Sequence, residues 1–317
     1  MIKNVVFMGT PDFATGTLKA LIASDRYQVQ AVFSQPDKPK GRGKTLQMMP
    51  VKAVAVEAGI PVYQPVKIRQ PEWIEELRKL RPDVIVVVAF GQIIPREILD
   101  IPEYGCINVH ASLLPKYRGA APVQWAVING ERESGVTTMR MDAGLDTGDM
   151  IMRTTVPLTK DETGGSLFEK LSAAGAQLLL ETLDALGEGT AVFEKQPAIS
   201  PTPYAAMLKK EDGRIDWKKS ACAIECLIRG TDPWPGAWTH FHGKLLKIWK
   251  AEAIMKEEEK EKAAEAPGVV CGVSRSGLYV QTGNGVISIL ELQPEGKKRM
   301  PVDAFLRGYP VQIGEQM

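Results

Sequence analysis

The chain has few cysteines and histidines and no long apolar run. Its four cysteines are scattered over 317 residues, which excludes a disulfide framework and favours a reducing compartment. With only three histidines there is no transition-metal ligand cluster. No apolar stretch approaches the roughly 18 residues of a membrane-spanning helix, and no signal-peptide core or Arg-rich transit pattern opens the chain. We expect a cytoplasmic protein without a membrane segment or a metal site.

The chain also lacks an excess of charge of one sign. Lysine and arginine number 39 against 38 acidic residues, a net charge of +1, so the overall charge neither requires nor excludes a polyanionic partner. Apolar residues make up 44% and charged residues 24%, which excludes wholesale disorder. At about 150 residues per domain, the length predicts two domains.

Strands and helices alternate in the first half of the chain. Val5–Met8 is a short apolar run that meets a turn, helix-spaced leucines follow, and Val29–Phe33 predicts the next strand. Val84–Phe90 is apolar at every residue, which is typical of a central parallel strand covered on both faces. Cys106–His110 and Gly135–Met141 are further strand candidates. The pattern predicts a doubly wound, mostly parallel α/β sheet of Rossmann-like type.

A long helix is expected at the end of this first domain. The helix covers Ser166–Gly187, and Ser166 with Glu169 has the spacing of a capping box. The residues that follow are rich in proline and have no period, which indicates a connector. We therefore expect a first domain at 1–189, a linker at 190–208 and a second domain at 209–317.

The second domain has a different pattern. Short β-rich runs at Leu245–Trp249, Val269–Val273, Leu278–Gln281 and Val286–Leu290 are separated by glycine, proline and charged turns. These runs predict a small OB-like β-barrel. The charged run Lys256–Ala266 indicates a solvated loop or helical extension, with an interaction tail as the alternative.

Two nucleotide-binding motifs are incomplete. Gly41–Thr45 resembles the end of a phosphate-binding loop, but Lys38 stands where that motif needs its first glycine. The first strand-to-helix turn, Gly9–Phe13, lacks the spacing of glycines that dinucleotide binding uses. Nucleotide hydrolysis and an NAD-dependent reaction are both disfavoured.

Positive charge is concentrated in two segments. Gln35–Lys52 carries five cations against one anion, and Lys209–Lys250 carries nine against five. Such residues neutralise a phosphate backbone whatever its base sequence, but a merely solvated loop has the same composition. The segments are compatible with a nucleic acid partner without proving one.

Asn108 and His110 are the strongest catalytic candidates. Residues i and i+2 of a strand point to the same side, here near the carboxyl end of a parallel strand where open sheets bind ligands. An imidazole beside an amide offers an acid/base group and a donor for a developing oxyanion, although a structural histidine is equally compatible. The later loop Asp142–Asp149 holds three carboxylates and could be a turn, a cation site or the source of one positioned carboxylate.

Eight sequence segments spread over nearly the whole chain form an ordered series. They are FMGTPDFA at 7–14, FSQPDKPKGRGK at 33–44, VVVAFGQIIP at 86–95, CINVHASLLPKYRGAAP at 106–122, MDAGLDTGDM at 141–150, RIDW at 214–217, DPWPGAW at 232–238 and LQPEGKKRM at 292–300. This series resembles the methionyl-tRNA formyltransferases, within the enzymes that use 10-formyltetrahydrofolate. The one departure inside the motifs is Ala111, where relatives often have glycine.

The resemblance implies a reaction and a catalytic trio. It implies transfer of the formyl group of 10-formyltetrahydrofolate to the amino group of methionyl initiator tRNA. Asn108 and a protonated His110 would stabilise the tetrahedral oxyanion, and Asp146 would orient the imidazole and relay the amine proton. A formyltransferase acting on a small amine or amino sugar is the alternative, since it would need the same trio but not the basic second domain.

The resemblance also implies binding residues and a monomer. The residues implied for folate binding are Phe90, Gly91, Gln92, Ile93, Ser112, Leu113, Leu114, Pro115, Asp142 and Gly144, with simple packing as the alternative for Leu113. The residues implied for tRNA binding are Lys38, Lys40, Arg42, Lys44, Lys209, Lys247, Lys297 and Lys298. The loop around Arg42 would enter the end of the acceptor stem. The two bases at the first position there do not pair, so the end of the stem opens at a low energetic cost.

Overall fold

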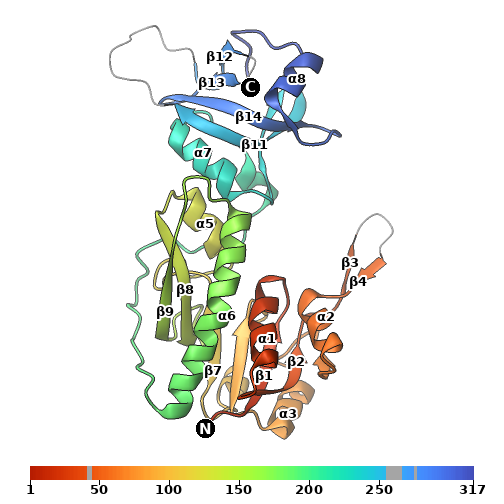
Figure 1. Ribbon diagram of the computed structural model, residues 1–317, viewed down its shortest axis with the longest axis vertical. Coiled ribbons are helices and arrows are strands. Elements are labelled where there is room, and N and C mark those ends of the chain that lie inside the picture. The colour runs from red at the N-terminus through yellow and green to blue at the C-terminus, as the bar shows by residue number, and fades with distance from the viewer. Residues whose placement is uncertain (41–44, 255–265, 275–276) are drawn as a thin grey trace. The chain divides into compact units, whose positions relative to one another are not determined.

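The structure is a computed structural model that describes residues 1–40, 45–254, 266–274 and 277–317 (Figure 1). Arg42, Lys44 and the charged run except Ala266 lie outside the described residues. The chain forms two compact units. The N-terminal unit comprises Met1–Pro122, Glu133–Pro157 and Phe168–Ala206, and the C-terminal unit comprises Val123–Arg132, Leu158–Leu167 and Met207–Met317.

A seven-stranded sheet forms the centre of the N-terminal unit. Its strand order is β5-β2-β1-β6-β7-β8-β9, in which the first five strands run parallel and the last two antiparallel. The central strands β1 and β6 are almost entirely buried, because their valine-rich sequences suit a sheet covered on both faces. The predicted mostly parallel α/β fold is confirmed. The strands are β1 Asn4–Gly9, β2 Gln28–Phe33, β5 Val62–Tyr63, β6 Val84–Val88, β7 Cys106–His110, β8 Glu133–Arg140 and β9 Asp149–Pro157.

Helices and one hairpin alternate with these strands along the chain. The basic segment after β2 contains a two-stranded hairpin, β3 Lys38–Lys40 and β4 Thr45–Gln47. The helices of the chain's first half are α1 Phe13–Ala23, α2 Pro50–Glu57, α3 Pro71–Leu80, α4 Arg96–Leu99 and α5 Pro122–Ile128. Helices α2 and α3 both begin at a proline, which is pre-organised for the first turn and needs no hydrogen bond there.

The long helix α6 covers Gly164–Glu188 and so begins two residues before the predicted start. The expected Ser166/Glu169 capping box is wrong. Instead, the backbone N–H of Ser166 donates to Thr163 Oγ1 at 3.0 Å, and the backbone N–H of Thr163 donates to Ser166 Oγ at 3.0 Å. Thr163 is therefore the N-cap, and a serine takes the place that Glu or Gln holds in the usual motif.

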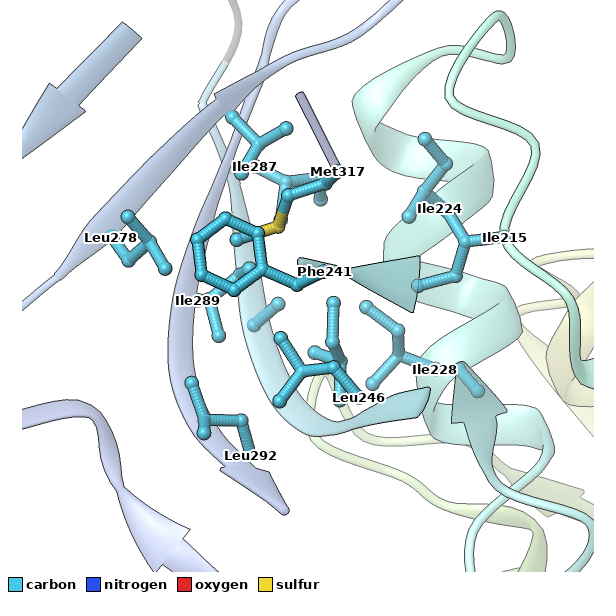
Figure 2. Close-up of a cluster of buried hydrophobic side chains, with 14 of the residues drawn as sticks. Ile215, Ile224, Ile228, Phe241, Leu246, Leu278, Ile287, Ile289, Leu292 and Met317 are labelled. Carbon is cyan, nitrogen blue, oxygen red and sulfur yellow. The ribbon is translucent and has the colours of Figure 1, made fainter. Parts of the chain in front are cut away.

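The C-terminal unit is built on an antiparallel sheet of order β10-β11-β14-β13-β12. The small OB-like β domain predicted here is confirmed, and its strands are antiparallel. Its core joins the strands to helix α7, which the sequence analysis did not identify: Ile224 and Ile228 of α7 pack with Phe241, Leu246 and Ile289 (Figure 2). The elements are the 3₁₀ helix η1 Lys210–Gly213, α7 Ala221–Gly230, β10 Ala237–Phe241, β11 Lys244–Ile254, β12 Val270–Val273, β13 Leu278–Gln281, β14 Val286–Pro294, β15 Met300–Pro301 and α8 Val302–Gly308.

The residues predicted as a linker are anchored to the N-terminal unit. The backbone of Glu194 pairs with that of Met150 at 2.8 and 2.9 Å, and Ala205 pairs with Arg118 and Ala121 at 2.8 and 3.0 Å. We call Glu194–Ala205 the strap, because it runs along the loops that follow β7 and β8. The domain division at 1–189, 190–208 and 209–317 stays a prediction.

Candidate active site

Strand β7 carries Asn108 and His110 on the same side of the central sheet. Their side chains are two residues apart, so the pleat aims both in one direction. Asn108 is 9% and His110 is 6% exposed, which places both at the edge of a buried core. Because β6 and β7 are parallel, the segment after β6 and the segment after β7 leave the sheet at the same edge.

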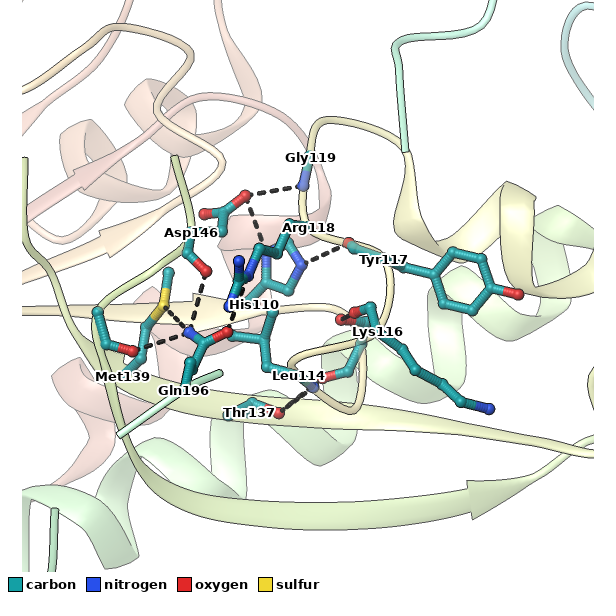
Figure 3. Close-up of polar contacts among 12 residues, drawn as sticks. His110, Leu114, Lys116, Tyr117, Arg118, Gly119, Thr137, Met139, Asp146 and Gln196 are labelled. Carbon is teal, nitrogen blue, oxygen red and sulfur yellow. Dashed lines mark hydrogen bonds and ion pairs between the residues drawn. The ribbon is translucent and has the colours of Figure 1, made fainter. Parts of the chain in front are cut away.

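The contacts of the His110 ring determine which of its two nitrogens carries the hydrogen of the neutral form. Nε2 lies 3.0 Å from the backbone oxygen of Tyr117 (Figure 3). A carbonyl oxygen can only accept, so Nε2 carries a hydrogen and the exchangeable position of the neutral ring is Nδ1. Nδ1 faces Asp146 Oδ2 at 3.8 Å, which is too long for a direct hydrogen bond and suits a bridging water or closure upon substrate binding.

Asp146 is held at both its side chain and its backbone. Oδ2 accepts a hydrogen bond from the backbone N–H of Gly119 at 2.9 Å. The backbone carbonyl of Asp146 accepts one from Nε2 of Gln196 at 2.9 Å, and the same amide nitrogen donates to the carbonyl of Gly148 at 2.8 Å. Asp146 has a φ of +54°, a left-handed conformation that persists only where the surroundings enforce it. These contacts bring two of the three predicted catalytic residues together.

Asn108, the third predicted catalytic residue, is available to a ligand. Within the described part of the chain its carboxamide has no hydrogen-bond partner, and its polar atoms are not among the side-chain atoms that are both fully buried and unpartnered. The amide can therefore bind a substrate group without first giving up a protein partner. Its N–H groups can serve an oxyanion that develops beside His110.

The predicted folate segment after β6 has an exposed backbone. Gly91 and Ile93 are exposed, while the carbonyls of Phe90 and Gly91 each accept a hydrogen bond from Gln35 Nε2 at 3.1 Å. The side chain of Gln92 is engaged elsewhere: it accepts from the N–H of Ile68 at 2.8 Å and donates to the carbonyl of Pro65 at 2.9 Å. This residue thus fixes the segment and offers a ligand only its backbone.

The predicted folate residues after β7 form a tight turn directly beyond His110. Ser112 Oγ donates to the carbonyl of Lys116 at 2.6 Å, and Thr137 Oγ1 bridges the Ser112 carbonyl and the Leu114 N–H at 2.7 and 3.1 Å. Leu113 and Pro115 are partly exposed, and the Leu114–Pro115 peptide is cis. The turn is rigid and exposes two apolar side chains.

Asp142 and Gly144 lie in the loop that also carries Asp146. Both are exposed. The Asp142 carboxylate accepts from the Gly144 N–H at 3.0 Å and from Thr147 Oγ1 at 2.8 Å, so it organises its own loop. The three predicted folate segments therefore come from the loops that follow β6, β7 and β8.

Cys106, on the same strand as Asn108 and His110, is buried. Burial raises the pKa of the Cys106 thiol to about 12, so this residue of β7 is not a nucleophile near neutral pH. The described residues contain no group of three or more His, Cys, Asp and Glu side chains suited to a metal ion. Among the helices so described, none is long and apolar enough to cross a membrane.

The residues predicted to bind tRNA differ in their exposure. Lys38, Lys209, Lys297 and Lys298 are exposed. Lys247 is only partly exposed, and its ammonium donates to the Pro235 carbonyl at 2.9 Å and lies 5.1 Å from the centre of the Trp249 ring. Arg42 and Lys44 lie outside the described residues, as does the side chain of Lys40.

Sequence reasoning missed Arg118 and Gln196. Arg118 is 7% exposed, and its Nε donates to Gln196 Oε1 at 3.0 Å (Figure 3). The available sequence signal for Arg118 was its place in the KYRG stretch, a few residues after His110. Gln196 offered none, because its proline-rich surroundings resemble a linker.

Comparisons with known proteins agree with this architecture. The formyl transferase family model matches residues 3–183, and the model of the formyl transferase C-terminal domain matches 207–310. A methionyl-tRNA formyltransferase of Agathobacter rectalis is 56% identical over 311 residues, covering 98% of both chains. One of Citrifermentans bemidjiense is 54% identical over 98% of this chain and 95% of its own.

A solved structure shares the fold. An N-formyltransferase from Helicobacter canadensis, in complex with folinic acid and dTDP-3-aminofucose, superposes with a TM-score of 0.67 at 21% identity, covering 93% of this chain and all of its own. Similarity at that level concerns the fold alone, whereas the full-length relatives share more than half of their residues with this chain. The chain therefore belongs to the formyltransferase family and, within it, to the methionyl-tRNA formyltransferases.

Proposed function

We propose that this protein transfers the formyl group of 10-formyltetrahydrofolate to the free amino group of methionyl initiator tRNA, releasing tetrahydrofolate and formylmethionyl-tRNA. The observation that carries the proposal is the pairing of His110 Nδ1 with Asp146 beside the unpartnered carboxamide of Asn108. This arrangement offers a proton acceptor and oxyanion donors around one histidine, as acyl transfer to an amine requires. The full-length relatives support the same activity.

The proposed reaction passes through attack of the uncharged amine on the formyl carbon. As the new C–N bond forms, the formyl oxygen becomes an oxyanion that accepts hydrogen bonds from the Asn108 carboxamide and from protonated Nδ1 of His110. The attacking nitrogen loses a proton toward Asp146, directly or through water. The oxyanion then collapses, the bond to the folate nitrogen breaks, and that nitrogen takes up a proton.

The folate donor is assigned to the loops around this trio. Folate would lie along the exposed backbone after β6, against the turn that contains Leu113 and Pro115, and beside the loop of Asp142 and Gly144. The rigid turn supports this assignment, because a preorganised apolar surface loses little entropy on binding a planar ring. A solved neighbour of the same fold holds folinic acid.

Initiator tRNA is assigned to the exposed lysines and to the basic hairpin. Exposed cations without buried partners can neutralise phosphates, and a loop that opens a weak first base pair selects by deformability. Lys297 and Lys298 meet this description. The roles of Arg42 and Lys44 rest on the sequence resemblance alone. We further propose that the protein acts in the cytoplasm as a monomer.

The deciding experiment is transfer of labelled formyl from 10-formyltetrahydrofolate to methionyl initiator tRNA. Parallel reactions use the same tRNA with a strong first base pair, free methionine and an amino sugar. Transfer confined to the initiator form supports the proposal, whereas transfer to the small amines with indifference to tRNA contradicts it. His110→Ala and Asp146→Ala should each abolish turnover while leaving tRNA affinity nearly unchanged, and loss of tRNA binding would contradict their assigned roles.

A further inference from the structure

The segment 117–119 after β7 contacts both members of the catalytic pair through its first and last residues. The carbonyl of Tyr117 binds His110 Nε2 at 3.0 Å, and the N–H of Gly119 binds Asp146 Oδ2 at 2.9 Å. Between them, the side chain of Arg118 turns to the strap (Figure 3). The position of this short segment therefore sets the distance between His110 and Asp146.

The Arg118 guanidinium is buried against neutral acceptors. Nε donates to Gln196 Oε1 at 3.0 Å, Nη2 donates to the Pro197 carbonyl at 2.7 Å, and Nη1 donates to the Ala198 carbonyl at 3.4 Å. Burying a charge without a carboxylate partner is expensive, and the planar donor fork fixes the orientation of the acceptors that it binds. The arrangement is costly for a connector that has only to join two domains.

Gln196 transmits this orientation to the catalytic loop. Its amide nitrogen donates to the carbonyls of Asp146 and Gly148, at 2.9 and 2.8 Å, and thereby closes the loop around the left-handed Asp146. Its amide oxygen is used by Arg118. The carboxamide thus has Arg118 as donor and the Asp146 and Gly148 carbonyls as acceptors, and its nitrogen makes a longer contact with Met139 Sδ of β8 at 3.8 Å.

We propose that Arg118 and Gln196 are positioning residues that hold the Asp146 carboxylate at the reactive distance from His110. The inference rests on the proposed function, because it assigns a role within the same reaction. Neither side chain supplies a group to the reacting atoms. Both act through the backbone of 117–119 and of 146–148.

The test uses Gln196→Glu and Gln196→Met in the full-length protein. Glu keeps the acceptor for Arg118 and removes the two donors, whereas Met removes donors and acceptor without adding charge. Both variants should lower kcat about tenfold to a hundredfold with the KM values for folate and tRNA nearly unchanged, since small misplacements of a catalytic group have effects of that size. Glu194→Gln is the matched control, because among the described residues that exposed strap side chain pairs with Arg153 alone, and the substitution leaves the Glu194 backbone bonds intact.

A double variant distinguishes a positioning role of Gln196 from a role in folding alone. In Asp146→Ala, where turnover is lost and only a slow single-turnover transfer at high enzyme concentration can be followed, the change Gln196→Met should have little further effect, because a residue that acts through Asp146 has nothing left to position. Multiplicative losses in the double variant, or unchanged kcat in a folded Gln196→Met, would overturn the proposal. A defect in Gln196→Glu alone would overturn it too, since the added charge would then be the cause.

A spectroscopic measurement keeps this inference apart from the proposed function. The chain has three histidines, and His110→Ala identifies the ring resonances of His110. These resonances should shift in Gln196→Met and not in Glu194→Gln, whether or not methionyl-tRNA is the acceptor. Unchanged His110 resonances would refute the positioning role, while failure of the tRNA assay with shifted resonances would refute only the acceptor.

Discussion

At the scale of single residues, the site depends on a carboxamide that the fold leaves without a protein partner. Asn108 is buried on β7, and within the described residues its side chain makes no hydrogen bond. Because the amide atoms of Asn108 are not closed off from solvent, the free protein bears little cost for leaving them without a protein partner. The residue is therefore expected to matter for catalysis and hardly for stability.

Asn108→Ala should separate these two effects. Loss of an oxyanion donor lowers the rate of formyl transfer by about a hundredfold to a thousandfold. The midpoint of thermal unfolding should stay the same or rise slightly, because no hydrogen bond of the folded protein is lost. Single-turnover formyl transfer and thermal unfolding measure the two quantities, and Asn284→Ala, at an exposed position of the C-terminal unit, is the control. An unchanged rate would show that the carboxamide does not serve the oxyanion.

The predictability of the site varies from residue to residue. Asn108 and His110 could be paired from the sequence, because the two-residue period of a strand is local. The candidate Asp146 required the family resemblance, since its contact with His110 spans 36 positions and depends on a loop whose path no local rule fixes. Gln196 was unpredictable because its role arises from tertiary hydrogen bonds within a segment of linker-like composition.

At the scale of elements, a polar network braces the base of the β3–β4 hairpin. Lys52 of α2 donates to Asp37 Oδ2 at 2.6 Å and to Gln64 Oε1 at 2.7 Å, and Gln64 Nε2 donates to Asp37 Oδ1 at 2.9 Å. Gln64 also donates to the carbonyl of Gln35, whose side chain binds the backbone after β6. The hairpin and the predicted folate segment thus share one hydrogen-bonded network.

The network predicts a pH dependence. The Lys52 hydrogen bond, together with those from Gln64 and the Met49 N–H, holds the pKa of Asp37 below its usual value of 3.8. A carboxyl with a lowered folded-state pKa stabilises the protein above its unfolded pKa, and this contribution is lost as the pH falls through the folded value. Asp37→Asn should lower stability by up to about 1 kcal/mol at pH 7, and the difference from wild type should shrink below about pH 4.

Urea unfolding of the wild type and of Asp37→Asn, at pH 7 and at pH 3.5, measures this difference. Asp100→Asn is the control, because Asp100 forms a largely exposed pair with Arg96 at 3.4 Å and has little to lose at either pH. A difference for Asp37→Asn that is equal at both pH values would contradict the ionic origin of the effect.

Elements were predictable where their pattern is local. The all-apolar β6 and the proline-started helices are of this kind. The start of α6 was not, because Thr163 and Ser166 cap it without the expected glutamate. Helix α7 was missed although Ser220 accepts a hydrogen bond from the Ala223 N–H, since its ten residues lie among segments of β-like composition.

At the scale of the whole molecule, the net charge is +1, but the lysines differ in whether their ammonium groups are free to bind a phosphate. Lys297 and Lys298 are exposed, whereas the ammonium of Lys247 is held by the Pro235 carbonyl and the Trp249 ring. An ammonium with partners inside the protein must give them up to neutralise a phosphate. The basic residues of the C-terminal unit are therefore not equivalent for a polyanion.

Salt titrations of tRNA binding test this difference. Lys297→Ala combined with Lys298→Ala should weaken tRNA binding and reduce the slope of log K against log salt by up to about 2, because roughly one counterion is released per neutralised phosphate. Lys247→Ala should leave the slope unchanged and lower stability by about 1 kcal/mol through the lost contacts. The reverse pattern, with a reduced slope only for Lys247→Ala, would assign the phosphate contact to Lys247.

The strap has a consequence for how the chain can be divided. A fragment ended at residue 189 would contain Asn108, His110 and Asp146 yet omit Gln196, which holds the Asp146 loop in place. A fragment extended to Ala206 would retain it, along with Val123–Arg132 and Leu158–Leu167, which belong to the C-terminal unit. The part of the chain that positions the reactive groups is thus longer than the span that contains them. Any exchange of the second domain for another would keep full rate only if the crossover point lay beyond the strap.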